Sequence, residues 1–307
     1  MEYTYTAVAK AKRLQPIALN GETAQILLAA VIIARSTSFL FAKILLQSMG
    51  PFTLLGVRFL IAFAFLAVAF HKKLTHLHWQ TLLRGFLLGV AFFGVMAAEL
   101  YSLQTTPSST VSFLENTAIV FVPLLEGILR RKCPRVPLLF SMAVTLLGIG
   151  LLAIPGGGIH FSMKRGESLG LLAAVLYAIV ILLTDRLSRK DDSFVLGILQ
   201  VGFIGLFAII AAFLFETPRL PSGQTEWILI LVLAFVCSGF GFTLQPVAQK
   251  YTSAERAGMF CAFSPVSAAI LGRIFLHESL GITGFAGAAL VLSGIFISTL
   301  VKQKELK

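Results

Sequence analysis

Residues 193–215, with the sequence SFVLGILQVGFIGLFAIIAAFLF, contain no charged side chain. A helix rises about 1.5 Å per residue, and about 20 apolar residues cross the hydrocarbon core of a membrane. The stretch therefore predicts a membrane-spanning helix. In the whole chain of 307 residues, 57% are hydrophobic and 13% are charged, and the mean hydropathy is +0.89. Soluble domains carry about 25% charged residues, so we expect most of this surface to face lipid.

Other stretches share this apolar character, and each is bounded by turn residues or charges such as Gly50-Pro51 and Asp191-Asp192. We therefore predict an all-α polytopic membrane protein with ten transmembrane helices. Their expected ranges are 24–46, 50–70, 80–103, 107–129, 135–155, 167–187, 193–215, 226–248, 253–276 and 281–301.

The net charge is +11. In a soluble protein such an excess suggests nucleic acid, but here the basic side chains lie in short loops, so no nucleic-acid partner is expected. They cluster in the first 23 residues, in alternate loops and at the C-terminus, whereas the opposite loops hold few. Because cytoplasmic loops carry the excess of Lys and Arg, we predict a multi-pass protein of the cytoplasmic (inner) membrane with both termini in the cytoplasm.

The chain also contains a weak internal repeat, because residues 112–150 align without gaps on residues 258–296. With five helices in each half, the second half would enter the membrane upside down, so we predict two inverted five-helix repeats. Repeats of this kind place a substrate site near the middle of the membrane, between the halves. The expected organisation is a cytoplasmic tail, a first repeat, a second repeat and a second cytoplasmic tail, at 1–23, 24–158, 159–302 and 303–307.

Several short motifs are similar to those of one known family. They are Gln249-Lys-Tyr-Thr-Ser-Ala-Glu-Arg-Ala-Gly258, Ser264-Pro265 and His277-Glu278 in the second half, with Ser36-Thr37-Ser38-Phe39 and Lys43 in the first. The chain resembles the EamA-type branch of the drug/metabolite transporter superfamily over about residues 24–302. The resemblance implies two five-helix repeats, termini inside, and transport of a small organic metabolite without ATP. Where the family often has Trp-Gly, this chain has Ala34 and Arg35.

Members of the family export or import amino acids, nucleoside-like compounds, sugars or amphipathic drugs. We expect export of an amino acid or related amphipathic compound by alternating access, driven by a proton gradient or by simple facilitation. The alternatives are uptake of a cationic nutrient, a lipid flippase, or a membrane subunit that transports nothing. The sequence has no phosphate-binding glycine loop, His-Glu-x-x-His helix or Cys-x-x-Cys pair, so we expect no enzyme activity, no cofactor and no metal site.

Ionisable side chains at membrane depth are the strongest candidates for the polar site, namely Arg35, Arg58, Glu99 and Glu115. Each costs about 2.5–3.5 kcal/mol to insert, so each needs a partner or a water-filled cavity. One interpretation is that the two carboxylates only neutralise the arginines and fix helix packing. The other is that one of them binds a proton, the candidate coupling ion, or a cationic substrate group. Glu115 is the better candidate for that role because it sits deeper.

The family's use of the inner helix faces suggests further candidates for substrate binding. They are Ser36, Ser38, Tyr101, Asn116, Tyr177, Gln245, Phe260 and Ser264. The polar ones are equally suited to hydrogen bonds between helices. Candidate hinges are Pro123, Pro246 and Pro265, because a proline inside a helix removes a backbone hydrogen bond and can kink the helix.

Overall fold

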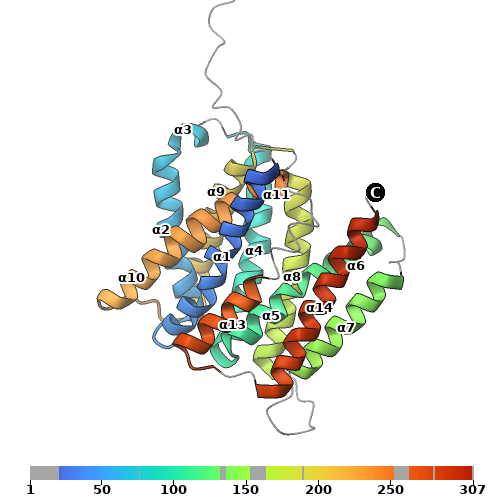
Figure 1. Ribbon diagram of the computed structural model, residues 1–307. Helices are drawn as coiled ribbons and strands as arrows, with labels where there is room; N and C mark the ends of the chain where they lie inside the picture. The colour runs from blue at the N-terminus through green and yellow to red at the C-terminus, as the bar shows by residue number, and fades with distance from the viewer. Residues whose placement is uncertain are drawn as a thin grey trace, which may run out of the picture.

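The computed structural model describes residues 21–75, 77–131, 136–152, 164–188, 190–251, 263–278 and 281–305, and every regular element within these ranges is helical (Figure 1). The prediction of an all-α protein is therefore confirmed. In chain order the elements are α1 (Gly21–Leu45), α2 (Pro51–Ala69), α3 (His71–Leu74), α4 (Trp79–Thr105), α5 (Ser108–Asn116), α6 (Ala118–Arg130), α7 (Val136–Leu152), α8 (Arg165–Ser188), α9 (Ser193–Phe215), α10 (Gln224–Val232), the π-helical segment η1 (Leu233–Phe242), α11 (Thr243–Tyr251), α13 (Phe263–Phe275) and α14 (Gly281–Glu305).

In the described part of the chain, 7 helical stretches are long and apolar enough to cross a membrane. Shorter apolar helices fall within three more of the predicted ranges, at Leu139–Ile149, Ser264–Phe275 and Gly281–Gly294. The chain is therefore a multi-pass membrane protein, and the count of ten spans remains a prediction. The seven long stretches are Ile26–Leu45, Pro51–Ala69, Trp79–Thr105, Ser108–Leu129, Arg165–Ser188, Ser193–Phe215 and Gln224–Ala248.

The helix predicted at 107–129 is divided into α5 and α6, which meet at Thr117. Thr117 Oγ1 donates to the Leu114 carbonyl at 2.6 Å, and the Thr117 N–H also turns back to Leu114. A threonine side chain that bonds to a nearby carbonyl competes with the regular helical ladder. As a result α5 is a separate unit of 9 residues, with Glu115 and Asn116 in its last turn.

The helix predicted at 226–248 contains η1 followed by α11. Pro246 lies inside α11 and has no N–H to donate to the carbonyl of Phe242. Gln200 on α9 supplies the missing bond, with 2.7 Å between its Nε2 and Phe242 O. Pro246 thus interrupts the backbone hydrogen bonds of the helix, and Gln200 on the neighbouring helix α9 replaces the missing one. Of the other candidate hinges, Pro123 lies within α6 and Pro265 in the first described turn of α13.

Helices α2 and α9, the second of each predicted half, pack side by side in opposite directions. Residue numbers rise along α2 as they fall along α9, because Leu60 lies against Gly205 and Phe63 against Gly202. A Cβ on Gly205 would lie 3.0 Å from the Leu60 nitrogen, so this glycine permits the close approach of the two backbones.

Helices α7 and α14, the fifth of each predicted half, form a second antiparallel pair. Gly148 lies against Gly287 and Thr145 against Gly294. Contacts between other helices also occur in matched sets, since α1 packs on η1 as α8 packs on α4, and α1 packs on α13 as α8 packs on α5. In the two predicted halves, α1 corresponds to α8, α4 to the helix containing η1, and α5 to α13. Replacing each helix by its counterpart therefore converts one contact of a set into the other.

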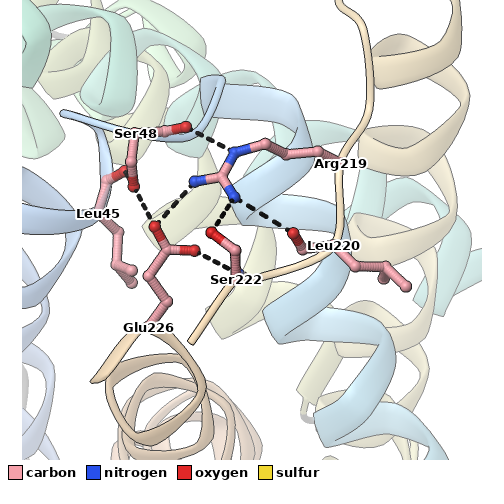
Figure 2. Close-up of polar contacts among 6 residues, drawn as sticks. All are labelled: Leu45, Ser48, Arg219, Leu220, Ser222 and Glu226. Atoms are coloured by element: carbon pink, nitrogen blue, oxygen red, sulfur yellow. Dashed lines mark hydrogen bonds and ion pairs between the residues drawn. The ribbon is translucent and has the colours of Figure 1, made fainter. Parts of the chain in front are cut away.

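The two ends of the bundle differ in their polar contacts. One end of the bundle holds the loops after α1 and α9, which are joined by Arg219. We call it the Glu216 end, because Glu216 directly follows α9 there. Figure 2 shows Arg219 donating to the Ser48 carbonyl at 2.8 Å and to Ser222 Oγ at 3.0 Å, with Glu226 at 2.8 Å as its ion-pair partner. The opposite end, called the Asp191 end, holds α3 and the start of α9 (Figure 1).

Candidate functional site

A small cavity lies among α1, α4, α5, α8, η1 and α13. Its volume is about 30 Å³, which holds about two water molecules. Pockets that bind small metabolites usually measure about 300–1,000 Å³, so the chamber in this conformation is too small to hold such a ligand. The lining residues are Ile32, Arg35, Ser38, Phe39, Met96, Glu99, Glu115, Asn116, Tyr177, Phe242 and Ser264.

Arg35 on α1 is held mainly by neutral groups. Its Nη1 donates to Tyr177 Oη at 2.9 Å and to Gln245 Oε1 at 2.5 Å, and its guanidinium lies 4.4 Å from the centroid of the Phe242 ring. Gly241 leaves room for the side chain, because a Cβ there would lie 2.9 Å from Arg35 Cγ. Charged hydrogen bonds contribute about 1.5–3 kcal/mol each and a desolvated cation–π contact about 2 kcal/mol. Together they exceed the insertion cost of about 2.5–3.5 kcal/mol.

Glu115 on α5 is only loosely paired with Arg35. The distance from Arg35 Nη2 to Glu115 Oε1 is 4.0 Å, and the two side chains are 14% and 4% exposed. Glu115 Oε2 is buried without a hydrogen-bond partner. Glu99, from α4, lines the same chamber, so two buried carboxyl groups face it together with Arg35. The chamber therefore combines Arg35, a cation that is not fully neutralised, with Glu115, a carboxyl group with one oxygen that accepts no hydrogen bond.

Arg58 on α2 lies behind the chamber rather than in its wall. It is 1% exposed, and its Nη2 donates to Met96 Sδ at 3.4 Å. Its Nε and Nη1 have no hydrogen-bond partner. A thioether is a weak acceptor, so these contacts alone do not offset the burial of a guanidinium. The Arg58 guanidinium also lies 4.9 Å from the centroid of the Phe59 ring, so its described contacts are all weak ones.

The structure brings most of the sequence-predicted site residues to the chamber. Ser36 is not among its lining residues, because its Oγ donates to the Ile33 carbonyl in the same helix. Tyr101 packs on Phe52 with a centroid distance of 5.3 Å, towards the Glu216 end. Phe260 lies outside the described residues. The predicted residues that line the chamber are Arg35, Ser38, Glu99, Glu115, Asn116, Tyr177 and Ser264, and Gln245 contacts Arg35 directly.

An apolar part of the chamber wall, formed by Ile32, Phe39, Met96 and Phe242, was missed by the sequence reasoning. Two of these residues carried a usable signal. Ile32 and Phe39 are three residues before and four residues after Arg35, so on a helix they share its face. The sequence gives no signal that would place Met96 and Phe242 in the chamber wall, since apolar side chains in a membrane helix can face either lipid or a cavity.

A multi-pass helical bundle with a polar chamber among its helices is an architecture suited to passing a solute through a membrane. The model of the EamA-like transporter family matches the chain twice, at residues 23–154 and 164–300. The chain therefore belongs to the EamA-like transporter family. The resemblance seen in the sequence motifs is confirmed.

Individual relatives agree with this assignment. An uncharacterized transporter of Archaeoglobus fulgidus is 26% identical over 94% of this chain and 100% of its own length, and the uncharacterized transporter YetK of Bacillus subtilis is 24% identical over 92% and 88%. The threonine/homoserine exporter RhtA of Escherichia coli is 25% identical over 71% of this chain and 72% of its own. A solved crystal structure aligns with a TM-score of 0.67 at 18% identity, over 93% of this chain and 99% of the other, which shows a shared fold.

Proposed function

We propose that this transporter exports a small amino acid or a related amphipathic zwitterion by alternating access. The observation that carries the proposal is the pairing of Arg35 with Glu115 in the wall of the chamber, at 4.0 Å and with one Glu115 oxygen lacking a partner. Opposite charges this far apart, and incompletely satisfied, suit a ligand that carries both charges on neighbouring atoms.

In this arrangement the substrate carboxylate binds the Arg35 guanidinium, and the ammonium group binds Glu115. A guanidinium recognises a carboxylate through two parallel hydrogen bonds, while the carboxylate of Glu115 accepts from the ammonium. The apolar wall residues Ile32, Phe39 and Phe242 lie beside the charged pair and would contact the substrate's carbon chain. The chamber must widen to admit such a ligand, because its present volume of about 30 Å³ is far too small.

Alternating access follows from the architecture that we propose, ten helices in two inverted repeats at 24–158 and 159–302. The antiparallel pairs α2–α9 and α7–α14 and the matched helix contacts support it. The distribution of basic residues supports placing both termini and the Asp191 end on the cytoplasmic side of the inner membrane, with the Glu216 end outside. The two halves would then rock about the chamber and expose it to each side in turn.

We propose protons as the coupling ion. Glu99 and Glu115 are two buried carboxyl groups that line one chamber, an arrangement that favours binding of a proton by one of them, and Glu115 also lies next to Arg35. A substrate ammonium on Glu115 would compete with that proton, which links substrate binding to proton release. Coupling of this kind converts an inward proton gradient into outward movement of the substrate.

The name of the relative RhtA, a threonine/homoserine exporter, supports export of an amino acid. Uptake of a cationic nutrient is less well supported, because Arg35 lies in the chamber and Arg58 lies directly behind it. Two cations oppose the entry of a third positive charge unless the ligand also carries a negative one.

The experiment that tests the function is counterflow in proteoliposomes containing the purified full chain. Radiolabelled threonine should accumulate in vesicles loaded with unlabelled threonine or homoserine, and loading with the amines putrescine or choline should give no accumulation. Accumulation with the amines alone would identify a cation carrier and overturn the proposal. No counterflow with any amino acid would also overturn it.

The coupling is tested separately with Glu115→Gln, which keeps the shape and removes the titrating group. Transport by the parent protein should rise when a proton gradient is imposed, whereas the variant should show the same rate with and without the gradient. Glu167→Gln is a matched control, because Glu167 is a half-buried side chain at the start of α8, outside the chamber lining, that accepts from the Lys164 N–H. A gradient response that survives in Glu115→Gln would exclude this residue as the proton carrier.

A further inference from the structure

Glu278, which follows α13, caps the first turn of α5. Its Oε1 accepts from the Ser108 N–H at 2.8 Å, and its Oε2 accepts from Ser108 Oγ at 2.9 Å and from the N–H and Oγ of Ser109 at 3.3 Å each. The first N–H groups of a helix have no partner within the helix, and the helix dipole favours a negative charge there. One carboxylate from another helix thus satisfies the start of α5.

The chain after α13 is shaped to deliver this carboxylate. His277 adopts a left-handed backbone conformation, with φ of 53°, and the Glu278 N–H donates to the Gly272 carbonyl at 3.1 Å. Gly272 also leaves space for the side chain, since a Cβ there would lie 2.6 Å from Glu278 Oε2. A non-glycine residue with positive φ is uncommon, so the turn indicates that the position of Glu278 is strongly determined.

Lys43 of α1 brings a third segment to the same place. Its ammonium group donates to the carbonyl of Thr106 at 2.8 Å and to that of Leu103, at the end of α4. The Glu278 contact therefore joins the segment after α13 to the start of α5, and Lys43 joins α1 to the end of α4 directly before α5.

The same chemistry occurs once more at this end, on a different helix pair. Glu216, after α9, accepts from the Phe52 N–H at 2.8 Å, from the Thr53 N–H at 2.9 Å and from Thr53 Oγ1 at 2.7 Å, and so caps α2. The difference is what the capped helix carries. Neither α2 nor α9 lines the chamber, whereas α5 contributes Glu115 and Asn116, and α13 contributes Ser264.

The short helix α5 is bounded on both sides. It starts after Pro107 and ends at the break at Thr117, and in the proposed transport cycle a change at that break would tilt its 9 residues together. The contact with Glu278 holds its free end.

We propose that Glu278 is the positioning residue of the outer gate. While it caps α5, the chamber is closed to the outside with Glu115 and Asn116 in place, and when the cap is released α5 tilts away from α13 and opens the chamber. Glu216 makes the equivalent cap on a helix pair that stays together throughout the cycle. This inference rests on the proposed transport cycle and on the orientation that places the Glu216 end outside.

Accessibility of the chamber tests the gate without a substrate. Ser38→Cys provides the reporter, because Ser38 lines the chamber and cysteine is similar in size. In a background with the 3 native cysteines replaced, a membrane-impermeant maleimide is added outside right-side-out vesicles. Adding Glu278→Gln should raise the labelling rate about tenfold, which corresponds to losing about 1.4 kcal/mol of charge-assisted contact. Glu216→Gln is the matched control and should leave the rate unchanged.

A reversible cross-link provides the second measurement and guards against a variant that folds poorly. A Cβ on Gly272 would lie 2.9 Å from Ser108 Oγ, so Ser108→Cys with Gly272→Cys can form a disulfide across the gate. Oxidation should stop threonine counterflow and reduction should restore it. Leu60→Cys with Gly205→Cys locks α2 to α9 in the same way and should leave counterflow unchanged when oxidised.

The outcomes separate the gate from the proposed function. Equal labelling with and without Glu278→Gln in folded protein, or an equal rise with Glu216→Gln, would overturn the gate. Undiminished counterflow through the oxidised α5–α13 pair would do the same. If instead no amino acid is transported but labelling rises only with Glu278→Gln, the proposed function fails and the gate stands.

Discussion

At the Glu216 end, the two carboxylates of Glu216 and Glu278 cap helices of the opposite predicted half, whereas at the Asp191 end Asp191 and Asp192 pair with side chains or cap their own helix. Asp192 accepts from the Phe194 N–H at 2.9 Å within its own helix α9, and Lys73 lies 3.5 Å from it. Asp191 lies 2.5 Å from Arg84 and accepts from Thr81 Oγ1 at 3.0 Å.

The difference between the two ends is one of strength and exposure. Ion pairs near a surface contribute about 0–1 kcal/mol, while a carboxylate that accepts two or three hydrogen bonds from a helix start contributes more. Asp192 is 39% exposed, which weakens its pair with Lys73 further. We infer that the described contacts hold the Glu216 end more firmly than the described part of the Asp191 end.

The largest effect is expected in the chamber that both ends enclose. Arg35→Leu removes the guanidinium that would hold the substrate carboxylate, and losing two charge-assisted bonds should reduce transport about 100-fold. Arg35→Lys keeps the charge without the planar fork and should lose only about tenfold. Concentration-dependent counterflow checks both variants. Equal loss in the two would show that charge matters less than shape, and an active Arg35→Leu protein would remove Arg35 from the binding site.

Much of this comparison was open to prediction from the sequence. Runs such as 193–215 indicate spanning helices because lipid leaves a chain no other way to satisfy its backbone. Ionisable residues at membrane depth, including Arg35 and Glu115, stood out because their insertion is costly. Their meeting in one chamber followed only once the helices had been placed relative to each other.

Other features depended on three-dimensional contacts that a sequence does not display. Glu278 stands out in the sequence only as part of the His277-Glu278 motif, because its contact with Ser108 spans 170 positions of the chain. The break at Thr117 was missed because a threonine inside an apolar run is as compatible with a continuous helix as with an interrupted one. Ser36 shares the polarity of Ser38 but lies on another side of α1, and its hydroxyl bonds to its own helix.

A smaller effect is expected when the Glu216 cap is removed from α2, because α2 and α9 do not line the chamber. Glu216→Ala leaves the start of α2 without its acceptor and should lower the free energy of unfolding by about 2 kcal/mol. For a chain of this size the midpoint of thermal unfolding in detergent should fall by about 4 °C. Glu216→Gln retains an acceptor and should show roughly half of this change. A midpoint unchanged in Glu216→Ala would mean that water replaces the carboxylate without cost.

The smallest effect is expected at the Asp191 end, where Lys73→Ala removes one exposed ion pair and the contact of the ammonium group with the Phe194 ring at 4.9 Å. Pairs of this kind contribute about 0.2–1 kcal/mol and are screened by salt, so the midpoint should fall by about 1 °C at low salt. In about 1 M salt, where charges are screened within roughly 3 Å, parent and variant should unfold together. Thermal unfolding at both salt concentrations measures this directly. The loss could instead be as large as that of Glu216→Ala, or could persist in high salt. Either result would mean that the two ends are held with equal strength, and the inference that the Glu216 end is held more firmly would fail.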